Sequence, residues 1–237
     1  MNVRTSCFLS LMLGLAAAHG GDISLDFNTL PSSQGWIYDN TGQIARESAV
    51  FSVAGGTLRL DTIGIGGGDV PGSTVYRRFG IIDPSQPFSI SLRARVLEVE
   101  SFPGLPRPFG FSAGAFTGSE QVGIGFTTSS IQTVDGFYGG RAPIPLDTTQ
   151  FHDYRIEARP GVGYDLFVDS ALVTTGHSVA IFFPNSLGFG DGTGAANARA
   201  EVTSFVFSQA ISQVPEPTGI ALILVGVAAL YVPQRRR

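Results

Sequence analysis

The sequence contains no lysine, and charged residues make up only 14% of the chain, against about 25% in typical soluble domains. All 15 basic residues are therefore arginines. Between Asp22 and Glu201, 18 acidic side chains outnumber 11 arginines. Non-specific nucleic-acid binding needs a basic surface that neutralises phosphates. The central part of the chain is therefore not expected to bind nucleic acid.

Cysteine and histidine are scarce as well. The single cysteine, Cys7, lies in the N-terminal segment described next, and only His152 and His177 lie beyond residue 20. A disulfide framework or a thiolate metal site needs several cysteines in the mature domain. Two histidines suggest neither a multi-histidine zinc site nor a Ser-His-Asp set.

The N-terminus has the three regions of a secretory signal peptide. Met1–Arg4 is a short basic start, Phe8–Ala18 is continuously apolar, and small residues precede a polar restart at Asp22. At ~1.5 Å per residue, the apolar stretch is too short to span a ~30 Å hydrocarbon layer as a stable helix. We therefore predict that residues 1–20 form a signal helix that directs export through the Sec machinery and is removed by signal peptidase.

The C-terminus combines a proline-rich tetrapeptide, an apolar segment and an arginine cluster. The tetrapeptide cannot continue a helix or a strand, because proline fixes φ and lacks an N–H donor. The apolar segment, Thr218–Val232, is at the short limit for a single transmembrane helix, and terminal arginines would hold its end in the cytoplasm. The residues concerned are Val214, Pro215, Glu216 and Pro217, then Arg235, Arg236 and Arg237.

This C-terminal arrangement resembles the PEP-CTERM sorting signal of Gram-negative bacteria, over residues 214–237. The resemblance implies that an exosortase-type membrane protease recognises and cuts the tail, in organisms that make extracellular polysaccharide. It also implies export through the inner membrane, anchoring by the C-terminal helix, and a final place at the cell surface or outside the cell. An ordinary tail anchor with Pro-Glu-Pro as a stiff linker is the alternative.

Residues 21–213 are predicted to form one all-β domain. Apolar residues there alternate or form short runs, which glycine, proline, asparagine and aspartate clusters interrupt. About thirteen candidate strands, among them Phe88–Val99 and Ile131–Phe137, occur without a convincing helix. We therefore expect a two-sheet antiparallel jelly-roll sandwich.

The clearest hairpin runs from Phe151 to Gly176. Tyr154, Ile156 and Ala158 share one face of its first strand, and Asp169-Ser170 forms a tight turn. The aromatic-His start, the alternating strand and the V-D-G type of turn resemble concanavalin A-like jelly rolls, the lectin and laminin-G-like group. Ser170 departs from this pattern, because glycine is usual at that place.

Glu98 and Glu100 are spaced to share one face of a strand. Glycoside hydrolases use two carboxyl groups that flank the scissile bond. The laminarinase-type motif of jelly-roll hydrolases is Glu-x-Asp-x-x-Glu, and the segment from Glu98 lacks its central Asp and its third carboxylate. We therefore expect a solvated pair and a non-catalytic domain.

The remaining candidate site residues concern calcium and sugars. Asp191 lies beside a glycine-rich turn and is the candidate ligand if calcium binds, since calcium prefers carboxylate and carbonyl oxygens. Four aromatic residues near turns could stack on sugar faces, although core packing is the default role of each. They are Trp36, Tyr38, Phe137 and Tyr138.

The leading functional hypothesis is an exported, non-catalytic β-sandwich that an exosortase-type system sorts and that associates with extracellular polysaccharide or biofilm matrix. Two alternatives remain open. One is a carbohydrate-active enzyme, a glycoside hydrolase on the same fold. The other is a structural matrix protein that binds no ligand.

Overall fold

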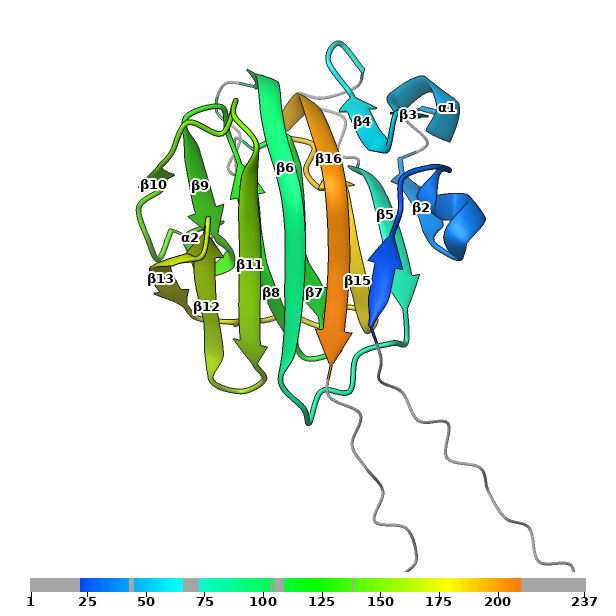
Figure 1. The fold of residues 1–237 in the computed structure, drawn as a ribbon. Helices are drawn as coiled ribbons and strands as arrows, with labels where there is room; N and C mark the ends of the chain where they lie inside the picture. Colours follow the sequence, from blue (N-terminus) through cyan, green and yellow to red (C-terminus); the bar gives the residue numbers. More distant parts are fainter. Residues whose placement is uncertain are drawn as a thin grey trace, which may run out of the picture.

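The computed structural model describes residues 22–42, 45–65, 73–102, 104, 109–137 and 139–209. Two antiparallel sheets of eight strands each form a sandwich (Figure 1). The predicted jelly-roll fold is thereby confirmed. The predicted signal helix and transmembrane helix lie outside the described residues. Within the described ranges, no helix combines the length and apolar character needed to cross a bilayer.

Sheet A contains the two longest strands, which lie side by side in Figure 1. A short strand, β1 (Ile23–Leu25), pairs with the last strand, so the two ends of the described chain are neighbours. In spatial order the other strands are β13 (Ala171–Gly176), β12 (Gly163–Val168), β11 (His152–Arg159), β6 (Phe88–Ser101), β16 (Ala196–Gln209), β4 (Thr57–Asp61) and β3 (Phe51–Ala54).

Sheet B lies behind sheet A in Figure 1. A two-residue strand, β14 (Val179–Ala180), pairs with one end of β8 (Glu120–Phe126). In spatial order the sheet consists of β10 (Ile144–Pro145), β9 (Ser130–Thr133), β8 (Glu120–Phe126), β7 (Phe111–Phe116), β15 (Ser186–Asp191), β5 (Ser73–Phe79) and β2 (Ile37–Thr41).

The core lies between the sheets and follows from the alternation of the strands. Ile90 and Leu92 of β6 are buried, as are Phe205 and Phe207 of β16. Successive side chains of a strand point to opposite faces, so the residues between them face solvent. Burial of this apolar surface is the main favourable contribution to folding.

The predicted hairpin is confirmed as β11 and β12, with Tyr154 opposite Val168 and Ala158 opposite Tyr164. The next turn, between β12 and β13, has Asp169 at φ 49° and Ser170 at φ 70°. Two left-handed residues in a two-residue loop match the twist of a β-hairpin. Ser170 adopts this conformation in place of glycine.

Three short helices interrupt the sheets: η1 (Pro31–Gln34), α1 (Glu47–Val50) and α2 (Val134–Phe137). The predicted strand Ile131–Phe137 is therefore wrong in its second half, since β9 ends at Thr133. The N–H of Val134 donates to the hydroxyl oxygen of Tyr164 in sheet A, at 3.0 Å, so it is not available to a strand neighbour. This change of direction brings Phe137 to the site described next.

Candidate functional site

Three glycines lie side by side on the outer face of sheet B. In the strand register, Gly188 of β15 is opposite Gly114 of β7, which is opposite Gly123 of β8. Their strand neighbours, such as Phe189 and Ala113, point inward and are buried. Because glycine has no side chain, none projects from the outer face at these positions, which we call the glycine floor; Gly114 and Gly188 are partly exposed and Gly123 is buried.

A hollow lies above the glycine floor, and we call it the floor groove. Side chains from three strands and from α2 line it around the glycines. They offer a guanidinium, a hydroxyl, an amide and two aromatic rings. The groups belong to Arg77, Ser112, Phe116, Gln121 and Phe137.

Arg77 of β5 forms one wall of the floor groove. Its Nε lies 2.6 Å from Oδ2 of Asp39 on the edge strand β2. The guanidinium carbon lies 5.5 Å from the ring centre of Phe116 and 4.7 Å from that of Phe183. Both distances are within the range of cation–π attraction. The Arg77 side chain is only 12% exposed, so these contacts fix its position.

Phe137 of α2 contributes to the opposite wall. Its ring stacks on that of Phe109 with 4.3 Å between the centroids. A Cβ atom at Gly125 would lie 2.5 Å from the Phe109 ring, so Phe109 covers β8 at this point. Among the three described aromatic residues singled out in the sequence, Trp36, Tyr38 and Phe137, it is Phe137 that the structure brings to the groove.

Trp36 has the core-packing role that is the default for it, and not that of a sugar-stacking surface. Trp36 is 3% exposed and meets Phe189 and Phe205 at right-angled ring contacts of 5.3 Å each. Tyr38 is half-buried between the sheets, packs edge-on against Phe51, and donates its hydroxyl to the carbonyl of Ala45 at 2.9 Å. The buried Trp36 ring is therefore closed to a ligand, and Tyr38 is partly covered by the core. Tyr138 lies outside the described residues.

Asp191 is buried between the sheets at the end of β15. The Thr62 hydroxyl donates to its Oδ2 at 2.7 Å. Burial raises the pKa of the Asp191 carboxyl to about 8, and the hydrogen bond from Thr62 opposes the rise. Within the described ranges, no three His, Cys, Asp or Glu side chains gather in a way that could hold a metal ion. Among the described residues, Asp191 is therefore not joined by other acidic side chains that could complete a calcium site.

Glu98 and Glu100 both accept hydrogen bonds near the end of β6. Oε2 of Glu98 lies 2.7 Å from Nη1 of Arg199. Oε2 of Glu100 accepts the backbone N–H of Gly64 and the side-chain amide of Asn197, each at 2.9 Å. The bond from Gly64, followed by that from Asn197, lowers the pKa of the Glu100 carboxyl. Both glutamates thus have structural partners, and Glu100 does not have the raised pKa of a general acid.

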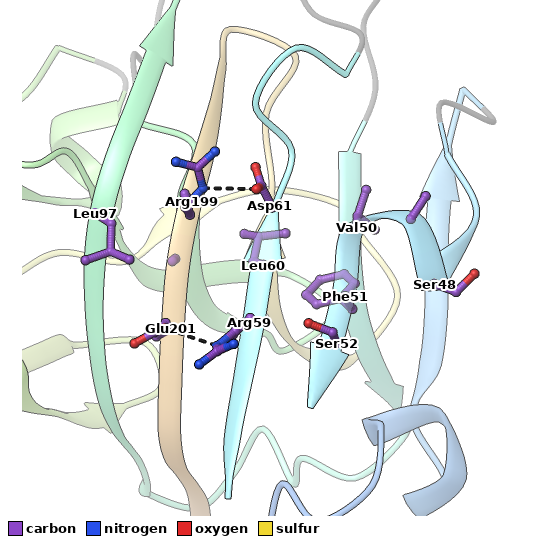
Figure 2. Close-up of a pocket in the computed structure, with 12 residues that line it drawn as sticks. Ser48, Val50, Phe51, Ser52, Arg59, Leu60, Asp61, Leu97, Arg199 and Glu201 are labelled. Carbon is purple, nitrogen blue, oxygen red and sulfur yellow. Dashed lines mark hydrogen bonds and ion pairs between the residues drawn. The ribbon is translucent and has the colours of Figure 1, made fainter. Parts of the chain in front are cut away.

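A second hollow lies on the outer face of sheet A, over β16 and β4 (Figure 2). Glu201 lies 3.2 Å from Arg59 and 2.7 Å from Arg95. Beside it, Nε of Arg199 lies 3.0 Å from Oδ2 of Asp61. Arginines and carboxylates alternate across this surface and pair with one another. It therefore presents little unbalanced charge to a ligand.

The sorting motif Val214, Pro215, Glu216 and Pro217 lies outside the described residues. So does the arginine cluster of Arg235, Arg236 and Arg237. These predictions rest on the sequence alone.

No family model and no curated protein matches the chain. Solved structures do match it. A prokaryotic β-1,3-1,4-glucanase (lichenase) derived from a mouse hindgut metagenome is 13% identical with a TM-score of 0.50, over 80% of this chain and 99% of that one. The endo-β-1,3-glucanase of Pyrococcus furiosus is 15% identical with a TM-score of 0.51, over 80% and 94%. A native glycosidic hydrolase is 18% identical with a TM-score of 0.52, over 84% and 100%.

The chain has the fold of these hydrolases. The likeness confirms the concanavalin A-like sandwich that the hairpin predicts. It also overturns the expectation of a non-catalytic domain, because two glucanases and a glycosidic hydrolase are among the proteins with this fold. That expectation depended on the absence of one sequence motif. A catalytic carboxylate pair needs a suitable separation in space, about 5 to 9.5 Å, and its members can be far apart in sequence.

Proposed function

We propose that this domain binds a polysaccharide chain in the floor groove of sheet B. The observation that carries the proposal is the row of Gly188, Gly114 and Gly123, which places no side chain on three adjacent strands between polar and aromatic walls and leaves Gly188 and Gly114 partly exposed. The fold shared with two glucanases supports a carbohydrate as the ligand.

The walls supply the groups that sugar binding requires. A sugar ring has an apolar face, which packs on aromatic rings such as Phe116 and Phe137. Its hydroxyl groups need hydrogen-bond partners, and Gln121 and Ser112 provide an amide and a hydroxyl in the groove. A bare floor lets the ring approach the sheet backbone closely.

Filling the floor should abolish binding without unfolding the domain. A Cβ atom at Gly188 meets its nearest neighbours at 3.4 Å, an ordinary contact, so Gly188→Val can fold. We expect polysaccharide affinity to fall at least about tenfold, since the valine occupies the space of the ligand. Affinity electrophoresis against a panel of soluble glucans and uronans measures it.

Thr203→Val, on the outer face of sheet A, is the matched control and should bind as the unchanged protein does. If Gly188→Val binds every polymer as tightly as the unchanged protein does, the placement of the site is contradicted. Binding of no polymer at all by the unchanged protein would contradict the function.

Hydrolysis is the second candidate, because two glucanases and a glycosidic hydrolase have this fold. Two carboxyl groups lie near the groove. Asp39 forms an ion pair with Arg77 in the wall of the groove, and Asp135 lies on α2, which follows β9. Four strands lie between β2 and β9, so five spacings of ~4.8 Å place these two strands roughly 24 Å apart. That separation is too large for one catalytic pair.

A reducing-end assay on every polymer that binds tests this second candidate. Loss of cleavage in Asp39→Asn would place the chemistry in the floor groove. Cleavage that the Asp39→Asn variant retains would place it elsewhere, and bound polymers that stay intact would contradict hydrolysis.

We also propose that the chain is exported and sorted to the cell surface of a Gram-negative bacterium by an exosortase-type protease. The support is the sequence of the two ends, residues 1–20 and 214–237. Replacing Pro215 and Pro217 by alanine should leave an uncut chain in the membrane fraction, which immunoblotting of cell fractions measures. Cytosolic full-length chain with both ends intact would contradict the proposal.

A further inference from the structure

Arg77 is a cation fixed beside the glycine floor, and its place suggests the chemical class of the sugar. We propose that the floor groove selects acidic polysaccharides, with Arg77 donating hydrogen bonds to the carboxylate of a uronic acid unit. This inference rests on the polysaccharide-binding function proposed above and adds to it the substrate class.

The contacts of Arg77 leave its groove side open to a ligand. Asp39 lies on β2, at the edge of the sheet, whereas the glycine floor begins on β15, on the other side of β5. The ion pair with Asp39 uses Nε of Arg77, at 2.6 Å. Nη1 extends toward the floor, since it lies 3.4 Å from the place that a Cβ atom of Gly188 would occupy.

The guanidinium is also held before any ligand arrives. The rings of Phe116 and Phe183 lie 5.5 and 4.7 Å from its carbon, and only 12% of the side chain is exposed. A fixed side chain loses little conformational entropy on binding. A guanidinium presents parallel N–H donors that match the two oxygens of a carboxylate, and such charge-assisted bonds are stronger than bonds to a neutral hydroxyl.

The outer face of sheet A offers a comparison within the same molecule. Arg95 also lies over an aromatic ring, with 4.6 Å from its guanidinium carbon to the centre of Phe151. Its partner Glu201 lies 2.7 Å from Nη2 and 2.9 Å from Nε, so both of these nitrogens face one carboxylate. Arg95 therefore resembles Arg77 in its aromatic contact but not in its access to a groove.

The experiment compares polygalacturonate with its carboxyl-reduced, neutral form, using the full chain purified in detergent. For Arg77→Gln we expect polygalacturonate affinity to fall about tenfold or more, since a bond to a charged group is worth about 1.5–3 kcal/mol. Affinity for the neutral polymer should fall much less, since glutamine keeps a hydrogen-bonding group in this wall of the groove. Arg95→Gln is the matched control and should bind both polymers as the unchanged protein does.

A second variant keeps Arg77 in place. Asp39→Asn removes the competing negative charge beside the guanidinium and should raise the affinity for polygalacturonate alone. Thermal melting of both variants separates a binding effect from a loss of fold.

The outcomes distinguish this inference from the proposed function. Equal affinity of the unchanged protein for the two polymers, or equal losses for both in Arg77→Gln, would overturn acid selectivity while leaving polysaccharide binding intact. No binding of either polymer, together with no binding across the wider glycan panel, would overturn the function itself.

Discussion

Asp191→Asn should stabilise the folded domain at pH 7 to 8 and reduce the dependence of its stability on pH. Asp191 is 4% exposed, and burial raises the pKa of its carboxyl from 3.8 to about 8. Between these values the folded chain holds a proton that the unfolded chain has released. The unchanged protein therefore loses stability as pH rises through this window, by up to about 1.4 kcal/mol per pH unit.

Asparagine has no charge at any of these pH values, and its carbonyl oxygen can still accept the hydrogen bond from Thr62. The two proteins should be similar in stability near pH 4, and the variant should be more stable by a few kcal/mol, at order of magnitude, near pH 8. Urea unfolding at each pH from 4 to 9 measures the free energy of unfolding. Asp153→Asn is the control, because that side chain is 63% exposed.

Parallel curves of unfolding free energy against pH for the unchanged protein and Asp191→Asn would contradict a protonated, buried Asp191. The same two proteins test the calcium prediction. A metal ion bound to the ionised carboxylate would stabilise the unchanged protein on addition of calcium and would leave the variant unaffected.

Gly114→Val should prevent folding or destabilise the domain severely. A Cβ atom at Gly114 would lie 2.3 Å from the carbonyl oxygen of Val122 and 2.8 Å from the Cα of Gly123, both in the neighbouring strand β8. Backbone atoms paired in a sheet cannot move aside as a flexible side chain can, so the cost should exceed the ~1–3 kcal/mol of ordinary overpacking. Thermal unfolding followed by circular dichroism measures it.

Gly188→Val provides the contrast, since the same residue is introduced in the next strand where the nearest atoms are 3.4 Å away. We expect it to melt near the temperature of the unchanged protein. Similar melting of the two variants would show that the close approach at Gly114 does not constrain the fold.

The strands themselves could be predicted because their pattern is local. Alternation in Phe88–Val99 indicates a strand, and the structure extends β6 from Phe88 to Ser101. The prediction failed at Ile131–Phe137, where Tyr164 of sheet A binds the N–H of Val134 and the chain turns into α2. That hydrogen bond joins residues 30 positions apart, and no local pattern contains it.

Burial could not be read from the sequence near turns. Trp36 follows η1, and Gly35 at φ 82° directs the chain so that Trp36 enters the core. Nothing in the sequence marks Arg77 as a binding residue, since it is one arginine in an alternating strand. Its significance comes from Asp39, Phe116 and Phe183, which lie 38, 39 and 106 positions away along the chain.

The sequence by itself determined the β-rich class, the turns and the hairpin of β11 and β12, because alternation and turn chemistry act over a few residues. It is also the sole basis for the predicted export and sorting segments. The tertiary structure alone decided that Gly114, Gly123 and Gly188 form one floor and that Arg77 lies beside it. The physical reason is that strand order and register depend on pairings between distant segments, which the packing of the whole sandwich selects.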